Sequence, residues 1–115
     1  NPSLLYQASA RGIRPIRCKG LALGLGDLPT FDRLVENKEI SLEPGDIFFQ
    51  YTDGIQHAMN ARGERFGMDR LMSCILENTS VQAQALVDRV LDRVVAFSAG
   101  RPQFDDITIV AVKRE

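Results

Sequence analysis

Hydrophobic residues occur in short runs along the first half of the chain, and turn residues separate these runs. The clearest run has apolar side chains on both sides of an extended backbone, because Ile47, Phe49 and Tyr51 alternate with Phe48. A strand of this kind is typical of the interior of a packed sheet. The Glu-Pro-Gly-Asp cluster before it is a strong turn signal. The pattern predicts five strands, at 3–7, 13–17, 34–42, 46–52 and 107–112.

The second half of the chain changes to a helical period. Within 68–77 the apolar residues Leu71, Cys74 and Ile75 share one side of a helix, and Asn-Thr-Ser follows as a break. A longer amphipathic helix is predicted at 81–97. No internal repeat or linker divides the chain, which is therefore treated as one unit. The apolar positions of the longer helix are Val81, Ala85, Leu86, Val90, Val94 and Phe97.

The composition is that of an ordinary globular protein, with 44% hydrophobic and 25% charged residues and a formal net charge of -1. This charge gives no reason to expect nucleic acid or an anionic membrane as a partner. No apolar run approaches the ~20 residues that span a bilayer, and the first residues show no signal-peptide pattern. Cys18 and Cys74 form no metal-binding spacing, so we interpret them as buried or half-buried thiols in a reducing cytoplasm, and a disulfide between them stays open as the alternative. Because Asn-Pro-Ser leads directly into a strand pattern, we expect a piece of a longer protein.

Aspartates stand where two predicted strands end and begin. Asp53 follows the strand at 46–52, and Asp105 and Asp106 precede the strand at 107–112. If these strands are antiparallel neighbours, Asp53 and Asp105 share one rim of the sheet. Converging carboxylates repel one another unless a cation lies between them, and oxygen ligands suit Mg²⁺ or Mn²⁺. Aspartates are also common in turns, so spacing alone leaves both interpretations open.

Several motifs resemble one enzyme family. The stretch 44–60, PGDIFFQYTDGIQHAMN, resembles the central motif of SpoIIE-type phosphatases, the bacterial branch of the metal-dependent (PPM) serine/threonine phosphatases. RGERFGMDRL at 62–71 continues the match, and FDDITIV at 104–110 resembles the closing motif. KGLALG at 19–24 and NPSLL at 1–5 resemble the segments upstream. The motifs occur in the family's order along nearly the whole chain.

The resemblance implies an α/β (α+β) sandwich, PP2C-like, in which two antiparallel β-sheets pack face to face, helices flank them and metals lie at one rim. Residues 1–115 correspond to the C-terminal part of the domain, with about five strands and two main helices. The family's other metal ligands belong to an Asp-x-Ser-Gly-type motif, which this sequence lacks. We therefore expect the chain alone to be inactive or nearly so.

The resemblance also implies site residues and a reaction. Asp53 and Asp105 match metal-binding positions of a two-metal site for Mn²⁺ or Mg²⁺, and Asp106 and Gly54 are accessory candidates. The ions would hold the phosphate of phosphoserine or phosphothreonine and activate a water that attacks phosphorus. His57 stands where the family more often has an acidic residue. It is either a general acid or accessory ligand, or a partly exposed residue after the strand without a chemical role.

By family analogy the partner is a phosphorylated regulatory protein of the anti-anti-sigma (STAS) type, in a pathway that controls sigma factors, and a sensor or receiver domain is expected upstream. We expect the isolated piece to form a homo-oligomer or a swapped assembly, because half a domain leaves sheet edges uncovered. Two alternatives remain open: a phosphatase-like docking module without catalysis, and a metal-dependent hydrolase of small phosphates.

Overall fold

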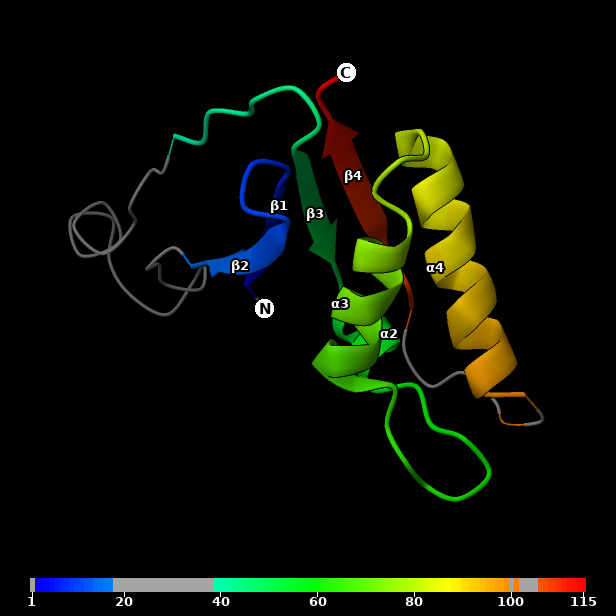
Figure 1. Ribbon diagram of the computed structural model, residues 1–115. Helices are drawn as coiled ribbons and strands as arrows, with labels where there is room; N and C mark the ends of the chain where they lie inside the picture. Colours follow the sequence, from blue (N-terminus) through cyan, green and yellow to red (C-terminus); the bar gives the residue numbers. More distant parts are fainter. Residues whose placement is uncertain (1, 18–38, 100, 102–105) are drawn as a thin grey trace, which may run out of the picture.

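The computed structural model describes residues 2–17, 39–99, 101 and 106–115. These residues contain a four-stranded sheet in the order β2-β1-β3-β4, and each neighbouring pair is antiparallel. Figure 1 shows β3 and β4 side by side in the middle of the molecule. The interior position predicted for the strand at 46–52 is confirmed, since β3 lies between β1 and β4. The strands are β1 (Ser3–Gln7), β2 (Gly12–Ile16), β3 (Ile47–Tyr51) and β4 (Ile109–Lys113).

Three helices accompany the sheet in the described part of the chain. The four-residue α2 (Asp53–Gln56) follows β3 at once, and α3 (Gly67–Glu77) and α4 (Ala83–Phe97) follow it. Figure 1 shows α3 and α4 side by side, with α4 next to β4. Both long helices were predicted from the sequence. The second one begins at Ala83 rather than 81, because Gln82 is still extended, with φ -67° and ψ 160°.

The core lies between the two long helices and one face of the sheet. Phe49 and Tyr51 project from β3 into this layer, and Phe66 packs edge-on against Phe97 with ring centroids 5.4 Å apart. Cys74 is fully buried there, as the sequence predicted for a thiol, while Cys18 lies outside the described residues. Burial of this apolar layer is the main force that holds the helices on the sheet. The layer is completed by Leu4, Tyr6, Ile47, Ile55, Leu71, Ile75, Leu86, Val90 and Val94.

The opposite face of the sheet is only partly covered. Phe48 is half-buried and Gln50 is exposed, although both belong to the central strand β3. On the neighbouring strand β4, Val110 and Val112 retain 49% and 48% of their accessible surface. Cross-strand pairs join Phe48 to Val112 and Gln50 to Val110. The sheet therefore has one closed face and one face with exposed hydrophobic side chains.

The predicted strand at 34–42 is wrong over its described part. Residues 39–42 form no strand, and residues 34–38 lie outside the described residues. The physical reason is that an apolar pattern shows which side chains can be buried but not whether the backbone joins a ladder, and residues 39–42 pair with neither edge strand, β2 or β4. These residues lead instead into the predicted turn. Asp46 closes that turn, since its buried carboxylate accepts hydrogen bonds from the backbone N–H groups of Ala8 at 2.9 Å and Glu43 at 3.0 Å.

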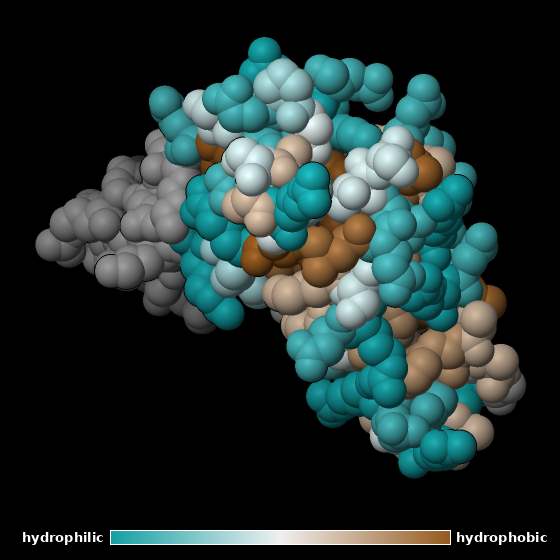
Figure 2. All heavy atoms as spheres, viewed as in Figure 1, coloured by the Kyte–Doolittle hydropathy of each residue, from teal (hydrophilic) through white to brown (hydrophobic). Residues whose placement is uncertain are grey.

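Hydrophilic residues dominate much of the surface seen in Figure 2, which has the viewpoint of Figure 1, and a band of hydrophobic residues is visible between them. Within the part of the chain that the structure describes, no helix combines the length and hydropathy needed to cross a membrane.

Candidate metal centre

β3 and β4 bring two acidic segments to the same end of the sheet. Their last paired residues are Tyr51 and Ile109, so the chain leaves β3 beside the point at which it enters β4. Asp53 begins α2 directly after this pair, and Asp106 lies just before β4. The predicted antiparallel neighbours are therefore confirmed. Asp105, the second predicted ligand, lies outside the described residues.

The Asp53 carboxylate is exposed at this end of the sheet. Its Oδ1 atom accepts a hydrogen bond from Nε2 of Gln56 at 3.3 Å. Its backbone carbonyl accepts the N–H of His57 at 3.0 Å, which closes the single turn of α2. The short helix thus fixes the backbone of Asp53 while the side chain stays accessible from solvent.

Of the described atoms at this end of the sheet, those that could bind a metal ion are the carboxylate oxygens of Asp53 and Asp106. Among residues 2–17, 39–99, 101 and 106–115, no three His, Cys, Asp or Glu residues are grouped closely enough to hold a metal ion. Mg²⁺ usually binds to one or two carboxylates and keeps several waters, so it does not require a complete protein cage. The chemistry of the Asp53 and Asp106 carboxylates fits Mg²⁺ or Mn²⁺, and these two residues would supply only part of a ligand set.

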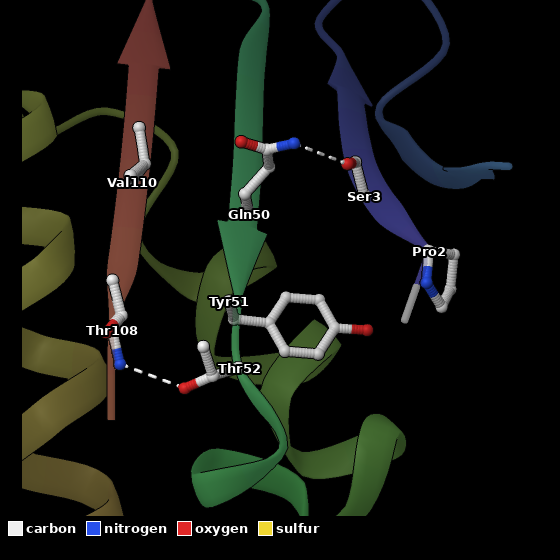
Figure 3. Close-up of a pocket in the computed structure, with 7 residues that line it drawn as sticks. All are labelled: Pro2, Ser3, Gln50, Tyr51, Thr52, Thr108 and Val110. Atoms are coloured by element: carbon white, nitrogen blue, oxygen red, sulfur yellow. Dashed lines mark hydrogen bonds between the residues drawn. The ribbon is translucent and has the colours of Figure 1, made fainter. Parts of the chain in front are cut away.

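Thr52 connects the two acidic segments through three hydrogen bonds. Its backbone N–H donates to the carbonyl of Thr108 at 3.1 Å. The N–H of Thr108 donates to the Thr52 hydroxyl at 3.0 Å, as Figure 3 shows, and the hydroxyl donates to the carbonyl of Asp106 at 3.0 Å. Thr52 was part of the sequence motif, but no role was assigned to it. The only local signal is a hydroxyl residue between the end of an apolar strand and Asp-Gly.

Gly54 packs against the backbone of the second acidic segment. A Cβ atom at this position would overlap the carbonyl oxygen of Asp106 and lie 3.0 Å from its carbonyl carbon and from Cγ1 of Ile107. Gly54 is also buried. A glycine is required here because any side chain would push α2 away from the segment that enters β4.

His57 is the C-terminal cap of α2 and is half-buried. A partly exposed residue in a short helix after the strand is one of the two interpretations of the sequence, and this position agrees with it. The role of His57 as a general acid or accessory ligand stays a prediction.

Tyr51 links this end of the sheet to the core. Its hydroxyl donates a hydrogen bond to Sδ of Met68 in α3 at 3.1 Å, and the side chain is only 8% exposed. Burial raises the pKa of the Tyr51 phenol above its ordinary value, and the negative charge of Asp53 raises it further, while Arg17 acts in the opposite direction. The phenol is therefore kept neutral beside the exposed carboxylate.

A hollow of about 260 Å³ lies beside Thr52 on the end of the sheet. Figure 3 shows its lining residues, among them Thr52 and Thr108. Nε2 of Gln50 on β3 donates a hydrogen bond to the hydroxyl of Ser3 on β1 at 3.1 Å. The hollow places a partly polar surface next to the residue that precedes Asp53. Its other lining residues are Pro2, Tyr51 and Val110.

Comparisons with known proteins identify relatives of this chain. The model of the family described as Stage II sporulation protein E (SpoIIE) matches residues 1–115. Protein IcfG of Synechocystis sp. is 32% identical over 110 residues, which are 96% of this chain and 17% of IcfG.

Two solved structures share the arrangement of strands and helices. The SiaA-PP2C domain of Pseudomonas aeruginosa has a TM-score of 0.73 and 23% identity, over 99% of this chain and 44% of that domain. The phosphatase domain of the cell fate determinant SpoIIE from Bacillus subtilis, presoaked with Mn, has a TM-score of 0.66 and 17% identity, over 100% of this chain and 47% of that chain. The sheet and its helices match part of the PP2C phosphatase fold, and the chain spans less than half of each solved domain.

Proposed function

Because this chain belongs to the SpoIIE family, we propose that it is the C-terminal part of a protein phosphatase domain that hydrolyses phosphoserine or phosphothreonine on a regulatory protein. The observation that carries this proposal is the position of Asp53 at the same end of the sheet as the segment with Asp106. The family analogy supports a phosphoprotein of the anti-anti-sigma (STAS) type as substrate, in the cytoplasm, and an upstream sensor or receiver domain.

Asp53 and Asp105 would hold Mn²⁺ or Mg²⁺, and Asp106, which follows Asp105 in the sequence, would be an accessory residue. When bound, these ions supply charge stabilisation for the phosphoryl group and a water acidic enough to act as the nucleophile. The chain's own residues orient the acids. Gln56 holds one oxygen of Asp53. Because no side-chain nucleophile is needed, the buried thiol of Cys74 has no part in the reaction.

The proposal is tested by Asp53→Asn in the intact protein that carries this segment. The substitution keeps the side-chain shape but removes the charge that attracts a divalent cation. We expect Mn²⁺-dependent release of phosphate from a phosphorylated STAS-type protein to fall by at least about 100-fold, with a similar loss of Mn²⁺ affinity by calorimetry. Asp69→Asn, at an exposed position in α3, is the matched control and should leave both values unchanged.

The result has a clear contrary outcome. Wild-type activity and Mn²⁺ affinity in Asp53→Asn would remove Asp53 from the site. Faster hydrolysis of a nucleotide monophosphate than of the phosphoprotein would favour the hydrolase of small phosphates. The isolated 115 residues, assayed in parallel with Mn²⁺, should release no phosphate above the blank.

A further inference from the structure

Thr52 lies at the exact change from strand to helix, and its side chain takes over a hydrogen bond of the ladder. In an antiparallel pair of strands, every second pair of opposite residues exchanges two backbone hydrogen bonds. Here the N–H of Thr52 donates to the Thr108 carbonyl, but the returning N–H of Thr108 donates to the Thr52 hydroxyl instead of its carbonyl. The Thr52 carbonyl accepts the N–H of Ile55 at 3.2 Å instead, in the first turn of α2. Thr52 thereby makes hydrogen bonds both to Thr108, which directly precedes β4, and to the first turn of α2.

The same hydroxyl also reaches the acidic segment before β4. As a donor it binds the carbonyl of Asp106 at 3.0 Å, while as an acceptor it binds Thr108. A hydroxyl can do both at once because it carries one proton and two lone pairs. Gly54 adds a steric condition, since a Cβ atom there would overlap the Asp106 carbonyl oxygen. Two independent features therefore fix the backbone next to Asp53 against the backbone of Asp106.

We propose that Thr52 and Gly54 are positioning residues that set the separation between the backbones of Asp53 and Asp106. The claim that these acids bind a metal ion rests on the proposed function, whereas the fixed separation of the two backbones does not. Neither residue touches the substrate or the ion. They act by holding two ligand-bearing segments, which converge from opposite strands, in one geometry.

The test compares Thr52→Val with Thr52→Ser in the intact protein. Valine keeps the shape but loses the hydroxyl, and serine keeps the hydroxyl. Thr79→Val, whose hydroxyl lies in the α3–α4 connection, is the control. In the metal-free protein, Thr52→Val should speed hydrogen exchange in the peptide covering 106–109, and Thr52→Ser should not. Mn²⁺ affinity by calorimetry should fall about 10- to 100-fold in Thr52→Val and recover in Thr52→Ser, as for residues that orient metal ligands.

The two readouts separate the two proposals. Unchanged exchange and unchanged Mn²⁺ affinity in Thr52→Val would overturn the positioning role. If Thr52→Val exchanges faster and the wild-type protein itself binds no Mn²⁺, the positioning role is supported and the proposed function is overturned. If Thr52→Val does not fold, judged by circular dichroism, the pair Thr52→Ala and Thr52→Ser decides the same question. Gly54→Ala should reproduce the faster exchange with the hydroxyl still present, and normal exchange there would contradict the steric part of the inference.

Discussion

Tyr51 illustrates how the fold changes the chemistry of a single side chain. The phenol lies in the core, donates a hydrogen bond to Met68 and faces the charge of Asp53. Burial is the largest of the influences that raise its pKa, because the phenolate loses hydration there. A raised pKa in the folded state means that the folded protein holds this proton more tightly than the unfolded chain does. The proton on Tyr51 therefore contributes to the pH dependence of stability.

This contribution has a defined direction. It is fully present below the unfolded tyrosine pKa of about 10 and is lost as the pH rises through the higher folded pKa. We expect the urea midpoint of the wild-type domain to fall above pH 10 by more than that of Tyr51→Phe. Below pH 9 the free energies of unfolding of the two proteins should differ by a constant amount of under about 1 kcal/mol, because Tyr51→Phe loses the hydrogen bond to Met68. Tyr6→Phe serves as control. Parallel curves for wild type and Tyr51→Phe up to pH 11.5 would contradict the role of Tyr51.

At the scale of elements, α4 is attached to the rest of the molecule along one stripe. Val90 on that stripe is completely buried, whereas Val95 on the same helix is 66% exposed. The polar side of α4 carries a 2.7 Å ion pair from Arg93 to Glu77 of α3, but both side chains are about half exposed, so this pair contributes little. Lys113 of β4 donates to the carbonyls of Thr79 and Val81, each at 2.8 Å, and thereby holds the α3–α4 connection over the sheet.

The two valines of α4 offer a matched pair of substitutions. Val90→Ala removes buried methyl groups and leaves a cavity, which should lower the free energy of unfolding by about 1–2 kcal/mol after the better helix propensity of alanine is counted. Val95→Ala loses no buried surface, and because alanine has the better helix propensity it should raise the free energy of unfolding by up to about 0.6 kcal/mol. Urea unfolding of the two variants measures both. Equal effects at the two positions would mean that α4 does not pack through the stripe with Val90.

At the scale of the whole molecule, the sheet is closed by helices on one face and open on the other. Val110 and Val112 stand on the open face next to Phe48. The chain covers less than half of the solved domains that share its fold. In a sandwich of two sheets, such a face is the natural contact for the remaining sheet, and in its absence a second copy of the chain can bury the same apolar surface.

We therefore expect the isolated 115-residue chain to self-associate through this face. Light scattering at increasing concentration should show dimers or larger species for the wild type. Val112→Lys should shift the equilibrium towards monomer, because a lysine would be buried in the contact. Val95→Lys, on the exposed side of α4, should leave the association unchanged. A wild-type chain that remains monomeric at high concentration would contradict the expectation.

The local elements were largely readable from the sequence. The strands at 3–7 and 13–17 were placed within one residue, and both long helices within two residues at each end. Hydrophobic periodicity is a local property, so it reports correctly where a strand or an amphipathic helix forms. The prediction for 34–42 failed over residues 39–42 for the same reason: an apolar pattern shows that a strand could form, but not whether its backbone pairs with a neighbouring strand. β4 also begins later than predicted, at Ile109, because the N–H of Thr108 donates to the Thr52 hydroxyl instead of to the Thr52 carbonyl.

The sequence by itself determined where the four described strands and the two long helices form, apart from the segment at 39–42, and it marked Asp53 and its neighbours through a motif. Only the tertiary structure decided that β3 lies between β1 and β4, which face of the sheet stays open, and that Thr52 binds residues 54 and 56 positions away. These features depend on which edges and hydrogen-bonding groups are already occupied when distant segments meet. No local pattern contains that information, because each segment has several partners that would satisfy its periodicity equally well.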